Sequence, residues 1–218
     1  MIFKLFIKLQ EYTLYLRLIY YKRKLNIKIH NMIIIKKSFI ALICALFLLT
    51  EMQAQKVHFL HHSTGRNLWL EGKVAEYIQN YNNKNGTNYL VTEYSYPNTP
   101  YPWDNYPYDY WNLWINKTCS NSNLNIECID QLTSKYNVII FKHCFPGAQI
   151  LEDVSNPKVS SDVKALNIYK LQYRALRDMM DSYPNNKFII WTLAPLHRLA
   201  TNPANAARAK EFTEWVKN

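Results

Sequence analysis

The chain has 218 residues and a formal net charge of +10, but the basic excess lies at its front. Residues 1–54 hold nine lysines and arginines against two acidic residues, whereas residues 55–218 hold 17 against 14. The charges of the longer part are interspersed and nearly balanced, which argues against nucleic acid as a partner. The length suits one domain of medium size.

The front of the chain has the layout of a secretory signal peptide. Lys36 and Lys37 precede an apolar run at 39–49, and a small residue follows at 54. The run is shorter than the roughly 20 apolar residues that a membrane-spanning helix needs. We therefore expect residues 32–54 to be a signal peptide, with an uncleaved membrane anchor as the alternative. Residues 1–31 are interpreted as an upstream extension from a start codon assigned too early, or as a long n-region.

Export would carry residues 55–218 to the periplasm or the cell exterior, where disulfides form. Cys119 and Cys128 are nine positions apart in a polar stretch, and a bond between them would close a loop. The alternative is two unrelated thiols. The cysteines lack the spacing of metal ligands, so we expect no metal site, and nothing in the chain indicates a cofactor.

Apolar runs of strand length alternate with helical patterns along residues 55–218. Continuous Val, Ile and Phe without polar alternation is typical of strands buried on both faces of a parallel sheet. The predicted strands are 57–61, 89–94, 137–141 and 187–192. The predicted helices are 67–82, a short one from about 108, 124–135, 161–182 (capped by Ser160 or Ser161) and 203–217. This order predicts an α/β fold, a three-layer sandwich around a parallel, flavodoxin-like sheet.

An aromatic segment interrupts the alternation at residues 94–114, where tyrosines and tryptophans, Trp103 among them, are interleaved with prolines. Proline excludes an internal strand, so we expect a long ordered loop. Loops at the carboxyl ends of parallel strands build binding sites in such sheets. The aromatic side chains would either stack on sugar rings or pack the loop onto the sheet.

The first predicted strand ends in the sequence His61-His62-Ser63-Thr64-Gly65. A histidine pair, a serine, a small residue and a glycine between a strand and a helix predict a tight turn that lifts one hydroxyl into solvent. Ser63 is then a candidate nucleophile, and a serine that caps the first helix is the alternative. Neighbouring residues of a strand point to opposite faces, so we expect one histidine to be buried and the other to lie at the rim of the site.

Other reactive side chains follow the later strands, and the carboxyl ends of parallel strands share one edge of the sheet. Lys142 and His143 follow the third strand, and either could donate a hydrogen bond to an oxyanion. The alternative for His143 is a structural role in the core. Cys144 is a thiol without a partner, either reactive or buried and inert. His197, after the fourth strand, is a base, a substrate ligand or a surface residue.

In the order and spacing of these motifs, the chain resembles the SGNH (GDSL-type) hydrolases over about residues 56–218. The family's first motif is a strand, Gly-Asp-Ser and a helix, and His61-His62-Ser63 occupies that position here. The segment 188–195 and the helix after it resemble a later strand, proline loop and helix. The glycine and asparagine of the second and third motifs have no counterpart. The family's Asp-x-x-His motif would lie beyond residue 218, so we interpret the chain as ending before the last strand and the catalytic base.

The resemblance implies an exported serine hydrolase, an esterase or deacetylase acting on an acylated carbohydrate. Ser63 would be the nucleophile, and Thr64, Lys142, His143 and Trp103 would bind the oxyanion or the substrate. The base would follow residue 218, with His197 as a candidate inside the chain. The alternative is a non-catalytic carbohydrate- or cell-wall-binding domain on the same fold. A membrane contact is expected only through the signal peptide or an uncleaved anchor.

Overall fold

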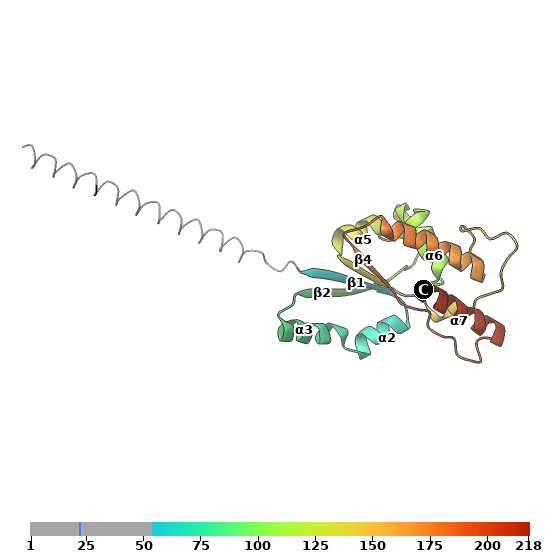
Figure 1. The fold of residues 1–218 in the computed structure, drawn as a ribbon, viewed down its shortest axis with the longest axis horizontal. Coiled ribbons are helices and arrows are strands. Elements are labelled where there is room, and N and C mark those ends of the chain that lie inside the picture. The colour runs from blue at the N-terminus through green and yellow to red at the C-terminus, as the bar shows by residue number, and fades with distance from the viewer. Residues whose placement is uncertain (1–21, 23–53) are drawn as a thin grey trace, which may run out of the picture. The chain divides into compact units, whose positions relative to one another are not determined.

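Four parallel strands form the centre of the fold (Figure 1). The structure is a computed structural model that describes Lys22 and residues 54–218, so the predictions for 1–31 and for the signal peptide at 32–54 fall almost entirely outside the described residues. The strands are β1 (Gln55–His61), β2 (Tyr89–Ser95), β3 (Val138–Phe141) and β4 (Lys187–Ile190). Their spatial order is β2-β1-β3-β4, and all neighbours run parallel.

The four predicted strands are therefore confirmed, as is the mixed α/β class with a parallel sheet. The register places Val57 of β1 opposite Val91 of β2 and Val138 of β3. In turn, Val138 lies opposite Lys187 of β4. The order has β1 and β3 in the middle, as in doubly wound sheets, and all four carboxyl ends lie at one edge.

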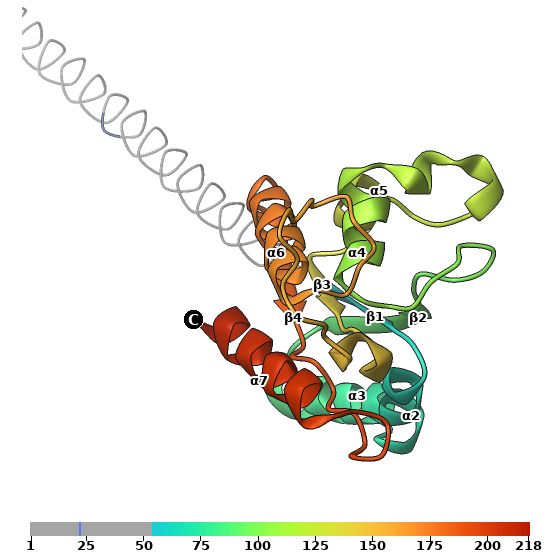
Figure 2. The same ribbon diagram turned by 90° about the vertical axis from the view of Figure 1, so that its right-hand side faces the viewer.

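Helices cover both faces of the sheet (Figure 2). One side carries α2 (Thr64–Glu71), α3 (Val74–Asn85) and α7 (Pro203–Lys217). The other side carries α4 (Pro107–Tyr110), α5 (Ile129–Lys135) and α6 (Leu166–Asp181). Short helical turns complete the elements of residues 54–218: a π-turn at Trp111–Ile115 and 3₁₀ turns at Thr118–Ser120, Ser122–Leu124 and Phe145–Ala148. Among residues 54–218, no helix is long and apolar enough to span a membrane.

The first helix is broken where a single helix was predicted over 67–82. It ends at Glu71, Gly72 follows, and Lys73 adopts a left-handed conformation with φ of 47° before α3 begins. Glycine is a frequent helix terminator because it loses more backbone freedom in a helix than other residues do. The break separates a short α2, which follows the Ser63 turn directly, from the longer α3.

Helix α6 begins at Leu166 rather than near 161, so the prediction that Ser160 or Ser161 caps it was wrong. The preceding residues pair with a distant extended segment instead. The Leu151 N–H donates to Lys164 O at 2.8 Å, and the Leu166 N–H donates to Leu151 O at 3.2 Å. Backbone groups engaged in this bridge are unavailable for helical bonds, which delays the start of the helix.

The main core lies on the side of α5 and α6. Leu60, Ile139 and Phe141 project to this side and are fully buried, together with Tyr110 and Trp114 from the aromatic segment. The opposite face is less covered: Ile189 and Trp191 are exposed, and an apolar groove of about 390 Å³ lies between the sheet and helices α2 and α3. Complete burial on both faces, which the apolar runs predicted, holds only for the end of the central strand β1 and for parts of β3.

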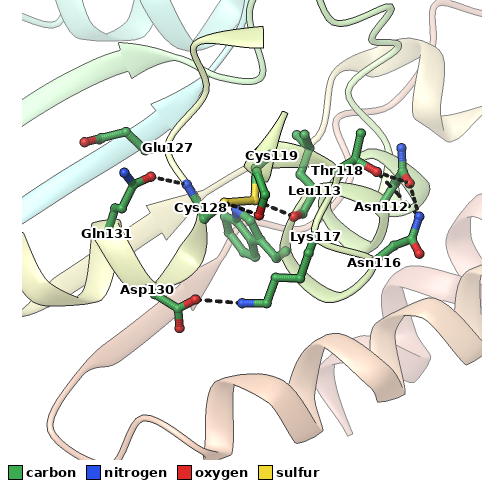
Figure 3. Close-up of a disulfide and its surroundings, with 12 residues drawn as sticks. Asn112, Leu113, Asn116, Lys117, Thr118, Cys119, Glu127, Cys128, Asp130 and Gln131 are labelled. Atoms are coloured by element: carbon green, nitrogen blue, oxygen red, sulfur yellow. Dashed lines mark hydrogen bonds and ion pairs between the residues drawn. A yellow bond between two sulfur atoms is a disulfide. The ribbon is translucent and has the colours of Figure 1, made fainter. Parts of the chain in front are cut away.

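A disulfide between Cys119 and Cys128 closes the loop before α5, as predicted (Figure 3). Side chains around it fix the loop further. The Lys117 ammonium lies 2.7 Å from an Asp130 carboxylate oxygen, and the Cys128 N–H donates to the Gln131 side chain at 2.8 Å. Cys144 is the free cysteine of the described residues, and it is buried.

Candidate functional site

Ser63 lies in the turn between the end of β1 and the first residue of α2, as the sequence predicts. Its backbone has φ of 44° and ψ of −110°, a conformation that non-glycine residues adopt at a cost in free energy. The Ser63 carbonyl accepts the N–H groups of Arg66 and Asn67 at 2.8 and 3.3 Å. Its side chain is exposed and makes no capping hydrogen bond. The hydroxyl therefore faces solvent and does not cap α2.

Gly65 allows this turn to approach β1 closely. A Cβ atom at position 65 would lie 2.4 Å from Cβ of His61 and 2.7 Å from its Cγ, much closer than ordinary van der Waals contact. Only a residue without a side chain fits against the His61 ring. The turn is thus packed directly onto the end of the strand that precedes it.

Both histidines before Ser63 are buried, so the expectation that one of them lies at the rim was wrong. The His61 Nε2 atom is 2.7 Å from a Glu93 carboxylate oxygen of β2, and its Nδ1 has no protein partner among the described residues. The His62 Nε2 donates to the Pro97 carbonyl. Burial lowers the pKa of both imidazoles, although Glu93 opposes the effect at His61 and the Pro97 carbonyl opposes it at His62. Each ring is already engaged on one nitrogen.

Lys142 reaches the turn from the end of β3. Its ammonium donates to Thr64 Oγ1 at 3.3 Å, and the residue is only 3% exposed. Among residues 54–218, no carboxylate forms an ion pair with it. Burial without an anion lowers the pKa of Lys142, with a smaller opposing effect from the nearby Cys144. Two of the predicted site residues, Thr64 and Lys142, are thus brought together beside Ser63.

His143 lies in the core. It is fully buried, its Nε2 is 2.7 Å from the Tyr173 hydroxyl of α6, and its ring packs edge-on against Tyr110 at 5.1 Å between centroids. Burial, and to a lesser extent the charge of Lys142, lowers the pKa of His143 to about 3. The imidazole is therefore neutral at pH 7. These surroundings fit a structural role for His143 better than a role as hydrogen-bond donor to an oxyanion.

His197 is exposed in the loop between β4 and α7, where its Nδ1 accepts the N–H of Leu199 at 3.3 Å. Within residues 54–218, no hydrogen bond joins it to the Ser63 turn. Cys144, next to His143, is buried, and burial raises the pKa of its thiol. A protonated and inaccessible thiol is a poor nucleophile.

The aromatic segment mostly packs the loop onto the sheet, which is one of the two expected roles. Most of its large side chains are buried, namely Tyr96, Tyr101, Tyr106, Tyr110, Trp111 and Trp114. Trp103 is half-buried and stacks on the His62 ring with centroids 3.5 Å apart. Through this stack, a partly open indole flanks the strand end that carries Ser63.

Two polar residues of the aromatic segment organise the site and were missed in the sequence. Asn105, with φ of 56°, donates from its side chain to Tyr96 O at 2.8 Å, and its own carbonyl accepts the Cys144 N–H at 2.9 Å. These bonds attach the loop to the end of β3. Asp109 accepts the backbone N–H groups of Asp104 and Tyr106, and burial raises its pKa to about 6. For Asn105, the one signal in the sequence was an asparagine between prolines in a long loop, because asparagine tolerates the positive φ that a tight turn needs.

Within the described part of the chain, no cluster of three or more histidine, cysteine, aspartate or glutamate side chains has the arrangement of a metal site. The site instead contains one exposed hydroxyl on a strained turn, a second hydroxyl bound to a buried lysine, and an aromatic side chain nearby. In comparisons with protein-family models, curated proteins and solved structures, nothing matches this chain.

Proposed function

We propose that the protein is an exported serine hydrolase of SGNH type, an esterase or deacetylase acting on an acylated carbohydrate, with Ser63 as its nucleophile. The observation that carries the proposal is the Ser63 turn. Its hydroxyl is exposed and free of capping bonds, at the carboxyl edge of a parallel sheet and at the start of a helix. Strained backbone of this kind concentrates at functional sites.

The turn also supplies donors for a developing oxyanion. Among the described residues, the backbone N–H groups of Ser63 and Thr64 donate to no other backbone group, so both are available to an acyl oxygen. The Lys142 ammonium at Thr64 adds positive charge to the same place. A tetrahedral intermediate on Ser63 would meet N–H donors at a helix N-terminus, which favours negative charge.

Trp103 supports a carbohydrate as the part of the substrate that carries the acyl group. Its indole is half-buried, held by the His62 ring and open on part of its surface. A fixed, partly exposed aromatic surface next to a nucleophile suits the apolar face of a sugar ring. Export, predicted from the front of the chain, would bring the protein to extracellular or cell-wall polysaccharides.

The test is acetate release from acetylated polysaccharides by the full chain. Ser63→Ala should abolish release, while Ser122→Ala, an exposed serine in the disulfide-closed loop, should leave it unchanged. Trp103→Ala should raise KM for the polysaccharide much more than for a small aryl acetate, because only the polysaccharide uses the indole. Turnover that survives Ser63→Ala would contradict the assignment of the nucleophile.

A non-catalytic carbohydrate- or cell-wall-binding domain is the second candidate. The observation that favours it is the engagement of the nearby imidazoles: His61 with Glu93, His62 with Pro97 O and His143 with Tyr173. Glycan binding that persists in Ser63→Ala and is lost in Trp103→Ala, without turnover in the wild type, would favour this function.

A further inference from the structure

The Ser63 turn depends on its surroundings for its conformation. Its φ of 44° is costly for a residue with a Cβ atom, and strained backbone persists only where the packing around it holds it in place. Two residues on, the Gly65 N–H donates to His62 O at 2.9 Å, and the Gly65 backbone packs directly on the His61 ring. The position of the Ser63 hydroxyl therefore depends on the position of that ring.

The His61 ring is held from several sides. Its Nδ1 edge faces the turn, since a Cβ atom at position 65 would lie 3.1 Å from Nδ1. On the other edge, Nε2 is 2.7 Å from a carboxylate oxygen of Glu93 in β2. The Phe59 ring, two residues earlier on the same face of β1, packs against the imidazole with centroids 4.8 Å apart. The imidazole is fully buried and cannot rotate without losing these contacts.

Glu93 makes the directional contact of this set. The contacts of Phe59 and Gly65 with the ring are van der Waals contacts, which fix its plane but not its hydrogen bonding. Among residues 54–218, the Glu93 carboxylate is the only hydrogen-bond partner of the His61 side chain. A carboxylate accepts hydrogen bonds, so Nε2 carries a proton and points at β2. Loss of this acceptor would leave a buried N–H unpaired, and the ring would turn to find another partner.

We propose that Glu93 is a positioning residue for the nucleophile: through the His61 ring, it holds the turn that presents the Ser63 hydroxyl. Glu93 acts through the ring alone and takes no part in proton transfer. The inference rests on the proposed function, because it concerns the reaction of the hydroxyl assigned there.

The test is the rate at which a fluorophosphonate labels Ser63 in the full chain, measured over a range of probe concentrations. Glu93→Ala removes the acceptor of His61 Nε2 and should lower the maximal labelling rate by about 10-fold or more, because a misplacement of about 1 Å can cost about 100-fold. The probe concentration that gives half the maximal rate should not change, since Glu93 does not bind the probe.

Two further substitutions of Glu93 separate its hydrogen bond from its charge. Glu93→Gln offers a neutral carbonyl oxygen at the same distance and should restore most of the rate. Glu93→Asp keeps the charge but shortens the side chain, so it should slow the labelling. The Glu93 side chain is 28% exposed on the edge strand β2, so neither change opens a closed cavity, and the pair decides the question even if the alanine variant does not fold.

A second histidine of β1 provides the matched control for a purely structural effect. His58 Nδ1 lies 2.7 Å from Thr92 Oγ1 of β2, a cross-strand contact of the same length to an imidazole that is also buried. His58 precedes His61 by three residues and therefore faces the opposite side of the sheet. Thr92→Val should lower the midpoint of urea unfolding, as Glu93→Ala does, but leave the labelling of Ser63 unchanged.

The outcomes distinguish the inference from the function on which it rests. If folded Glu93→Ala or Glu93→Asp labels Ser63 as fast as the wild type, the inference is wrong and the proposed function stands. The inference is also wrong if Glu93→Gln fails to restore the rate, or if Thr92→Val slows labelling as much as Glu93→Ala. If the folded wild type does not label at all, the proposed function fails, and the inference fails with it.

Discussion

Substitution of Gly65 by alanine tests the packing of the turn on β1. Two effects compete. In a helix, Gly→Ala normally stabilises by up to about 1 kcal/mol. The new Cβ, however, would lie 2.4 Å from Cβ of His61. His61 cannot move away easily, because its backbone pairs with β2 opposite Ser95 and its ring is bound to Glu93.

The steric effect should dominate. Overpacking of a well-packed site costs about 1–3 kcal/mol, and an overlap this deep belongs at the upper end of that range. After subtraction of the helix preference, Gly65→Ala should lower the free energy of unfolding by about 2 kcal/mol. For a domain of this size, that corresponds to a fall in melting temperature of about 4–8 °C. The displaced turn should also slow the labelling of Ser63.

Urea unfolding monitored by circular dichroism measures the effect, and Gly86→Ala is the matched control. Gly86 has φ of 63° and nothing within 4 Å of an added Cβ. Its substitution should therefore cost about 1–2 kcal/mol through the left-handed backbone alone and leave Ser63 labelling unchanged. If Gly65→Ala were as stable as the wild type, or more stable, the close approach of the turn to His61 would be refuted.

Three further predictions concern stability. Tyr173→Phe leaves the buried Nε2 of His143 without its partner and should cost about 1–3 kcal/mol in urea unfolding; an unchanged midpoint would contradict the bond. Reduction of the disulfide that closes the 119–128 loop should cost about 2–3 kcal/mol, measured with and without dithiothreitol, and no change would mean that the loop is ordered without it. Burial lowers the pKa of His58 to about 4 and that of His143 to about 3, so the unfolded state binds more protons below pH 6.5 and stability should fall as the pH drops from 6.5 to 4. Burial raises the pKa of Asp109 to about 6, which has the opposite effect on stability, but this is one carboxyl group against two imidazoles. Urea unfolding at pH 7 and pH 5 should therefore show a lower free energy of unfolding at pH 5, and His58→Gln should make the difference smaller. Equal stability at the two pH values would refute the prediction.

The sequence predicted the sheet well because its signals are local. The apolar runs around 57–61 and 137–141 are typical of buried strands, and parallel topology brings their ends to one edge. The disulfide was also predictable from the spacing of two cysteines in a polar stretch. The broken helix was missed although Gly72 carried a signal for it, because the apolar periodicity continues across the break.

The site was less predictable, because it depends on register and on backbone conformation. His143 follows a strand end and was a candidate for the site, yet it projects to the same side as Ile139 and Phe141, which α5 and α6 cover. Lys142 projects to the other side and reaches Thr64. Period-2 alternation separates the two residues, but only the packed structure shows which side is closed. Likewise, no sequence pattern predicts that Ser63, a non-glycine residue, adopts a positive φ.

The most direct test of the account is to treat the folded full chain with a fluorophosphonate and to map the adduct by peptide mass spectrometry. We predict one adduct on Ser63, absent from Ser63→Ala and present in the control Ser122→Ala, because the exposed turn presents the hydroxyl at the open edge of the sheet. A folded protein that acquires no adduct, or that acquires it on another residue, would contradict the assignment of Ser63 as the nucleophile.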